Sequence, residues 1–195
     1  MHTNKYKGLL RLSSYGLPMP EFIKIDNPEQ LDSPFLLANV KYGWTIRTCK
    51  KNGENEMSLF YKNNASFQEL KNILISRLSN HKDEFYVVYP SWDFYFSFNI
   101  LKTKYIYYIE GKIGSQKSIS SGQESPFFLY QYNTIRSSLD KPAREKLTAS
   151  DKRYLLKAIK LLEAVGIYED FYTEVAITTR GELFFYEYWQ VNNLI

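Results

Sequence analysis

Two glutamates near the end of the sequence carry the clearest chemical signal. Glu174 lies in the run 172–177 and Glu187 in the run 182–189, and both runs are rich in β-branched and aromatic residues. The polar segment 178–181 joins the runs and ends in glycine, so the pattern predicts a β-hairpin. With a two- or four-residue loop, the two glutamates become diagonal neighbours on one face, with backbones about 7–8 Å apart. A three-residue loop would place them on opposite faces.

A pair of carboxylates on one strand face predicts a metal site. The same predicted face carries Ala176, Leu183, Phe185 and Trp189. Like charges on such an apolar face repel and lose hydration unless a cation neutralises them. Mg²⁺ suits this role because it uses one or two carboxylates and takes its other ligands from substrate phosphates and water. A strand glutamate that is merely solvated, or paired with a nearby Lys or Arg, remains the alternative.

The composition is that of a globular protein. The chain has 195 residues, of which 44% are hydrophobic and 24% charged, which fits one domain or two small lobes. The net charge of +4 suits an anionic ligand such as a nucleotide and does not require nucleic acid. A single cysteine, Cys49, excludes an internal disulfide framework, and two histidines argue against His-based metal or triad chemistry.

The sequence also indicates where the protein works. No apolar run approaches the roughly 18 residues of a membrane span, and the first residues lack a secretory apolar core. We therefore expect a cytoplasmic protein without membrane association.

Helical and strand patterns alternate along the chain. Helices are predicted from Lys5 to Tyr15, from the capping box Ser66–Glu69, and from Thr148 to Gly166, the last with Ser150 or Thr148 as its capping residue. The expected strands are 21–25, 34–40, 44–49, 57–61, 85–89, 94–100 and 105–110, besides the hairpin. The stretch 112–123 is rich in Gly, Ser and Lys and predicts a mobile loop. This order predicts an α+β fold of mainly antiparallel strands, with lobes at 1–90 and 91–195.

Several segments, in their order, resemble the ATP-grasp superfamily. Lys5, Leu9 and Leu10, followed by the stretch 15–20, resemble its opening helix, and the stretch 34–47 is similar to the paired strands that flank its phosphate-covering lid. Val88 and Tyr89 stand where the adenine-contacting linker would lie. Glu174 and Glu187 are similar to its pair of acidic magnesium ligands. The order covers nearly all of the chain, and it carries more weight than any single motif.

The resemblance implies a Mg-ATP-binding protein with an ATP-grasp-like fold. The implied reaction is that of a ligase, which transfers the γ-phosphoryl group to a carboxylate and gives an acyl phosphate for a nucleophile to attack. The implied roles are metal binding by Glu174 and Glu187, phosphate binding by Lys5, Lys41 and Arg47, with Lys41 and Arg47 as catalytic candidates, and backbone contacts to adenine from Val88 and Tyr89. The acceptor substrate is not indicated.

The sequence departs from the family pattern in several places. The lid is expected to be the single tight turn 41–43 instead of a run with several glycines, and Trp189 stands where an Asn is usual. Ala38 or Asn39 replaces a nucleotide-contacting Lys. The family's amino-terminal domain is missing, so a protein partner is expected to supply it, or the full ligase reaction does not occur. A degenerate, non-catalytic domain that acts through a protein partner is therefore the alternative function.

A basic, aromatic nucleic-acid binder is a further alternative. The stacking surface would comprise Tyr105, Tyr107 and Tyr108 beside Lys102, Lys104 and Lys112. The modest charge argues against it. The alternation of the tyrosines does so too, because it sends about half of them to the other face of a sheet.

Overall fold

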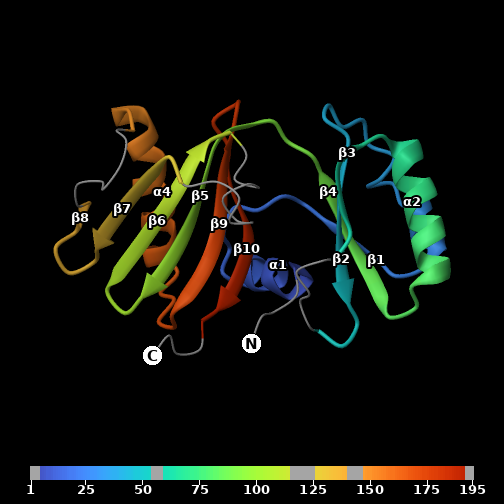
Figure 1. The fold of residues 1–195 in the computed structure, drawn as a ribbon, viewed down its shortest axis with the longest axis horizontal. Helices are drawn as coiled ribbons and strands as arrows, with labels where there is room; N and C mark the ends of the chain where they lie inside the picture. The colour runs from blue at the N-terminus through green and yellow to red at the C-terminus, as the bar shows by residue number, and fades with distance from the viewer. Residues whose placement is uncertain (1–4, 54–58, 115–125, 140–146, 192–195) are drawn as a thin grey trace. The chain divides into compact units, whose positions relative to one another are not determined.

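The structure, a computed structural model, describes residues 5–53, 59–114, 126–139 and 147–191 (Figure 1). Among these residues the chain forms two compact units. The first holds residues 5–8 and 20–92, and the second holds residues 9–19 and 93–191. Helices combine with two antiparallel sheets, which confirms the α+β prediction.

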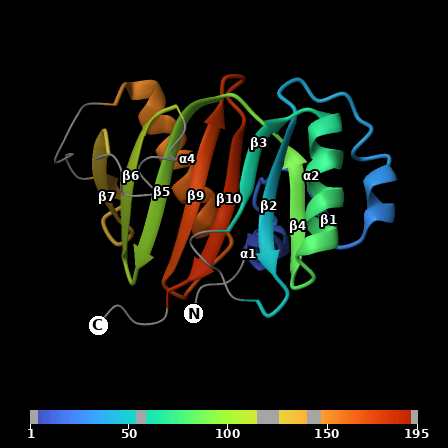
Figure 2. The ribbon, with the colours of Figure 1, turned by 45° about the vertical axis from the view of Figure 1, so that its right-hand side comes forward.

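The first unit is a four-stranded antiparallel sheet with a helix on one face. The strand order is β1-β4-β2-β3, with β1 at Ile23–Ile25, β2 at Trp44–Lys50, β3 at Tyr61–Ala65 and β4 at Glu84–Pro90. Helix α2, Phe67–Asn80, runs alongside this sheet (Figure 2). It begins at the predicted capping box, in which Ser66 and Glu69 exchange side-chain to backbone hydrogen bonds.

Alternation along the strands decides which side chains of this unit meet α2. Ile46 and Val88 are direct cross-strand partners, and both are fully buried in the cluster that includes Leu70 and Leu74 of α2. Because successive strand residues point to opposite faces, Arg47 lies on the other face of the sheet. The core of the unit therefore lies between β2, β4 and α2.

The strand expected at 34–40 is wrong, because this segment is a succession of turns. The Leu36 N–H donates to the Ser33 carbonyl at 3.0 Å, and the Phe35 N–H donates to Ser33 Oγ at 3.3 Å. These local bonds use donors that a sheet ladder would need, and Pro34 has none to offer. The turns bury Leu36 and leave Leu37 63% exposed.

The start of strand β3 and a short 3-10 helix complete the description of this unit. The strand expected at 57–61 begins later, since β3 runs from Tyr61 to Ala65, and residues 57 and 58 lie outside the described part of the chain. A short 3-10 helix, η1, Pro28–Asp32, follows β1 and is capped by Asn27.

The second unit is a six-stranded antiparallel sheet of order β10-β9-β5-β6-β7-β8. Its strands are β5 Phe94–Thr103, β6 Ile106–Ile113, β7 Phe128–Asn133, β8 Ser138–Leu139, β9 Phe171–Thr178 and β10 Leu183–Gln190. Strands β7 and β8 were not predicted. Helix α4, Ala149–Ala164, lies along one face of the sheet (Figure 1), and of the two capping residues that the sequence allowed it uses Thr148, in a capping box with Asp151.

Aromatic and branched side chains fill the face of this sheet that meets α4. Phe98 and Val175 are direct partners there, and Phe128 joins them from β7. The helix contributes Leu155, Ile159 and Leu162, all fully buried. The opposite face of the sheet is therefore the one left for polar side chains.

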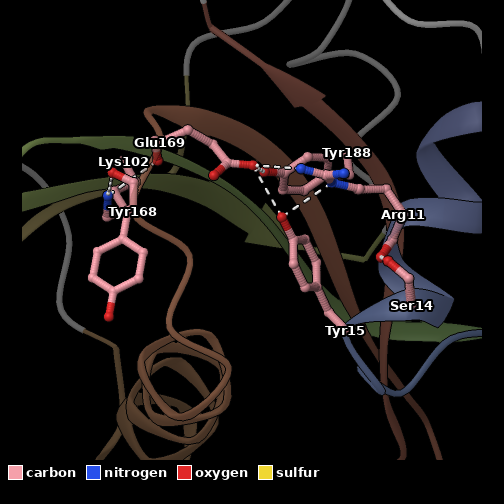
Figure 3. Close-up of polar contacts among 7 residues, drawn as sticks. All are labelled: Arg11, Ser14, Tyr15, Lys102, Tyr168, Glu169 and Tyr188. Atoms are coloured by element: carbon pink, nitrogen blue, oxygen red, sulfur yellow. Dashed lines mark hydrogen bonds and ion pairs between the residues drawn. The ribbon is translucent and has the colours of Figure 1, made fainter.

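A partly exposed cluster of hydrogen bonds ties the second unit together (Figure 3). Glu169 Oε1 accepts from Arg11 at 3.1 Å, from the Tyr15 hydroxyl at 2.9 Å and from the Tyr188 hydroxyl at 3.0 Å. Burial raises the pKa of Glu169, but the hydrogen bonds lower it further, so the pKa lies below the usual glutamate range. Lys102 Nζ donates to the Glu169 carbonyl at 3.1 Å. Helix α1, Lys5–Ser14, is thereby fixed through Arg11 to the segment that precedes β9.

Candidate metal and nucleotide site

The β9–β10 hairpin is confirmed, with a three-residue loop. The Thr178 N–H donates to the Glu182 carbonyl, and the Gly181 N–H donates to the Thr178 carbonyl, both at 2.9 Å. Gly181 has φ +80°, the left-handed conformation that this loop type requires and that glycine adopts without strain. A loop of this length, with regular pairing, would put Glu174 and Glu187 on opposite faces.

A β-bulge at Tyr186 brings the two glutamates back to one face. Phe185 pairs with Val175, and the next pair is Glu187 with Glu174, so Tyr186 is the extra residue. Glu187 is therefore the direct partner of Glu174, and the predicted diagonal arrangement is wrong. The bulge also turns Tyr188 toward the core, where it is 3% exposed and stacks on Phe171.

The bulge changes which side chains surround the glutamates. Leu183 and Phe185 were expected on the glutamate face, but they pair with Ile177 and Val175 and lie on the core face. Trp189 does lie on the glutamate face. Its ring stacks on that of Tyr172 at 4.1 Å, and the Tyr172 hydroxyl donates to Glu174 Oε1 at 3.3 Å. At the position where the family has an Asn, the hairpin thus presents an indole ring.

The two glutamates belong to a polar row that crosses four strands. Glu187 pairs with Glu174, Glu174 with Asn99 on β5, and Asn99 with Glu110 on β6. Asn99 Nδ2 donates to Glu110 Oε1 at 3.2 Å. Glu187 and Asn99 are 4% and 3% exposed, so both are buried in spite of their polarity. We call these four residues the carboxylate row.

Asn99 and Glu110 were not predicted as site residues. The alternation of Phe96, Phe98 and Ile100 shows that Asn99 points to the other face of β5. The sequence does not show which residues of β6 and β9 lie opposite it, because that depends on the pairing of strands distant in the sequence.

The donor set of the row fits Mg²⁺ better than a metal held wholly by protein. Among residues 5–53, 59–114, 126–139 and 147–191, no three His, Cys, Asp or Glu side chains converge on a common point. Mg²⁺ does not need such a cage, since one or two carboxylates suffice when phosphate and water complete its shell. Glu174 and Glu187, paired side by side, supply that number.

The predicted phosphate-binding cations lie in the first unit. The Arg47 guanidinium donates to Asn63 Oδ1 at 2.9 Å and lies 5.0 Å from the centre of the Tyr61 ring. Lys41 Nζ lies 4.8 Å from the centre of the Tyr42 ring. Arg47 is thus held by residues of β3, and Lys41 by its neighbour in the turn before β2.

Lys5 begins α1 and lies close to Cys49 of β2. Burial raises the pKa of the Cys49 thiol to about 11, while the Tyr6 backbone and the Lys5 charge act in the opposite direction. The thiol is therefore protonated at neutral pH and packs as a core group.

The predicted adenine-contacting residues are consecutive positions of β4. Val88 is fully buried, and it pairs with Ile23 on one side and Ile46 on the other. Tyr89 is 6% exposed and pairs with Thr45, beyond the point where the pairing with β1 ends.

The strand pair that was expected to flank the lid needs correction. The turn before β2 exists, with the Gly43 N–H donating to the Val40 carbonyl at 3.4 Å, but the segment 34–40 on its other side is not a strand. The paired strands are β2 and β3, and they flank residues 51–60. Residues 54–58 of that connection lie outside the described part of the chain.

The loop and the stacking surface that the sequence suggested are only partly described. Lys112 and Ile113 belong to β6, and residues 115–123 of the predicted loop lie outside the described ranges. Tyr107 is 2% exposed and Lys102 is 6% exposed, so neither is open to stack on or bind a nucleic acid.

Searches with the sequence give no relatives: no protein-family model matches it, and no curated protein matches it. In the part of the chain that the structure describes, no helix is long and apolar enough to cross a membrane.

Solved structures share the fold. The chain is similar to an ADP complex of PurK, N5-carboxyaminoimidazole ribonucleotide synthetase, with TM-score 0.57 and 14% identity over 98% of this chain and 45% of that one. It is also similar to Helicobacter pylori D-alanine-D-alanine ligase, with TM-score 0.54 and 12% identity over 97% of this chain and 54% of that one. The macrocyclase MdnC of Microcystis aeruginosa, bound to the precursor peptide MdnA, gives TM-score 0.51 and 15% identity over 97% of this chain and 52% of that one.

These three proteins are ATP-grasp enzymes, and this chain spans about half the length of each. The likeness at such low identity concerns the fold and not the reaction or the substrate. The protein has the ATP-grasp fold.

Proposed function

We propose that this chain binds Mg-ATP and serves as the nucleotide-binding part of a ligase that activates a carboxylate as an acyl phosphate. The observation that carries the proposal is the direct pairing of Glu174 with the buried Glu187. Two adjacent carboxylates, one of them almost without exposure, favour binding of a cation that offsets their repulsion. The solved structures with ADP or ATP bound, on the same fold, support the choice of nucleotide.

Each predicted residue has a role in this proposal. Glu174 and Glu187 would hold Mg²⁺, and the chemistry that the metal supplies when bound is neutralisation of phosphate charge. Arg47 and Lys41 would bind phosphate oxygens, Arg47 through the paired N–H groups of its guanidinium, and Lys5 would add positive charge. Val88 and Tyr89 would offer backbone groups to the base. We place this function in the cytoplasm, and the acceptor is defined only as a molecule that carries a carboxylate.

Thermal melting tests the proposal. Mg-ATP at one hundred times its dissociation constant should stabilise the wild-type protein by about 2.7 kcal/mol, or about 5–10 °C in Tm. The shift should require Mg²⁺ and should disappear in Glu187→Gln, which keeps the size of the side chain and removes its charge.

The matched control is Glu182→Gln, a change at an exposed glutamate of the same hairpin that lies outside the carboxylate row. It should keep the full shift. A wild-type protein that Mg-ATP does not stabilise would contradict the proposal and favour the non-catalytic alternative that acts through a protein partner.

A further inference from the structure

Asn99 holds a buried oxygen without a partner in the middle of the carboxylate row. The residue is 3% exposed, and its Oδ1 accepts no hydrogen bond from any described residue. Buried polar atoms in folded proteins almost always have a partner, so an orphan acceptor points to a group that binds there.

The hydrogen bond to Glu110 sets the orientation of the amide. Asn99 Nδ2 donates to Glu110 Oε1 at 3.2 Å, whereas the flipped amide would bring its oxygen against a carboxylate oxygen. The amide is planar, so Oδ1 is directed away from Glu110. That direction leads toward the side of the row where Glu174 is the partner of Asn99 and Glu187 the partner of Glu174.

We propose that Asn99 Oδ1 is a third oxygen ligand of the cation at Glu174 and Glu187, and that Glu110 is the positioning residue that aims it. This inference rests on the proposed function. Trp189 leaves the position two residues after Glu187 without an amide oxygen, and Asn99 provides one from the strand next to β9. Carboxylate and carbonyl oxygens are the donors that suit Mg²⁺ and Mn²⁺. Glu110 acts as outer partners of metal ligands do, by fixing the orientation of a ligand.

A ligand and a structural asparagine respond differently to removal of the amide. An asparagine kept for stability would leave the metal-free protein less stable when replaced. A ligand oxygen without a partner is unfavourable in the metal-free protein, and its removal offsets the loss of the hydrogen bond that Asn99 donates to Glu110. Asn99→Leu, of similar size, should therefore melt close to wild type without metal. The same change should weaken metal binding.

The test is the affinity for Mn²⁺ in the presence of ATP, measured from the electron paramagnetic resonance signal of free Mn²⁺, together with melting in chelator. Asn99→Leu should weaken Mn²⁺ binding about tenfold or more, and Glu110→Ala should weaken it through misorientation of the amide. The matched control is Gln131→Leu, an exposed amide on the next strand, opposite Tyr108, which should bind Mn²⁺ as wild type does.

The outcomes separate this inference from the proposed function. If Glu187→Gln abolishes Mn²⁺ binding while Asn99→Leu keeps wild-type affinity, the inference is overturned and the proposed function stands. If the wild-type protein binds no Mn²⁺ with ATP, both fail. If Asn99→Leu does not fold, Asn99→Asp decides: it should melt below wild type in chelator and recover with Mn²⁺, and a deficit that Mn²⁺ does not reduce overturns the inference.

Discussion

Replacing Glu84 with glutamine should lower the free energy of unfolding by about 3 kcal/mol, because it removes the anion from a buried ion cluster. Glu84 is 5% exposed, and its Oε2 accepts from Arg77 at 2.8 Å and from the Tyr86 hydroxyl at 2.8 Å. Its Oε1 lies 3.4 Å from Lys50 Nζ. Arg77 and Lys50 are themselves largely buried, and without the Glu84 carboxylate they have no buried anion among these contacts. Urea unfolding at neutral pH measures the loss.

Asp83→Asn is the matched control for Glu84→Gln. Asp83 binds the same Lys50 Nζ at 2.7 Å, but its side chain is 67% exposed, so water replaces the lost interaction. This variant should unfold close to wild type. Equal losses of unfolding free energy in Glu84→Gln and Asp83→Asn would contradict the argument that burial of Glu84 makes its ion pairs important for stability.

The same cluster predicts a pH dependence. Burial raises the pKa of Glu84, but the hydrogen bonds from Arg77 and Tyr86 lower it further, so the folded-state pKa lies below the unfolded value of about 4.3. A group with a lowered pKa stabilises the fold above the unfolded pKa, and that stabilisation is lost as the pH falls through the folded value. As the pH falls from 6 to the acid transition, Glu84→Gln should therefore lose less free energy of unfolding than the wild-type protein does. The two losses should differ by on the order of 1 kcal/mol for each pH unit by which the folded-state pKa of Glu84 lies below its unfolded value.

Replacing Gly111 with alanine should cost about 3 kcal/mol through overpacking. Gly111 pairs with Phe98 on one side and with Phe128 on the other. A Cβ atom at this position would overlap the Ser97 carbonyl oxygen, the Phe98 Cβ and the Phe128 ring. Two of these atoms belong to or adjoin the backbone and cannot move aside without shifting the strand. Glu110 would move with it, so melting and Mn²⁺ affinity should both fall.

Gly166→Ala is the control that distinguishes steric overlap of an added Cβ atom from the loss of glycine's conformational freedom. Gly166 has φ +65°, but a Cβ there would meet no atom within 4 Å. Its replacement should cost only about 1 kcal/mol, the strain of a left-handed residue. A Gly111→Ala loss as small as that of Gly166→Ala would show that the sheet can absorb the extra carbon.

Local signals allowed the sequence to predict much of the fold. The capping boxes at Ser66 and Thr148 lie within four residues and identify the starts of α2 and α4 without any tertiary contact. The segment 34–40 misled because its apolar residues resemble a strand, while Ser33 and Pro34 favour turns. Strand β7 was missed although Phe128, Tyr130 and Tyr132 alternate with less buried residues, and β8 has only two residues and so shows no pattern of its own.

The candidate site was predictable in its residues and not in its geometry. Glu174 and Glu187 stood out because each is a charged residue inside a run of mainly apolar and aromatic residues. Their actual pairing depends on a three-residue loop and on the bulge at Tyr186, two irregularities that compensate each other. The place of Asn99 beside Glu174 depends on the pairing of strands far apart in the sequence, which composition and periodicity do not reveal.

The most direct test of the account is calorimetric titration of ATP into the wild-type protein and into Glu174→Gln/Glu187→Gln, each with Mg²⁺ and with chelator. The account predicts that the wild-type protein binds ATP tightly only with Mg²⁺. It predicts that the double variant loses at least about a hundredfold in affinity, or about 2.7 kcal/mol, and no longer responds to Mg²⁺. Equal affinity of the two proteins for Mg-ATP would contradict a metal site at the paired glutamates.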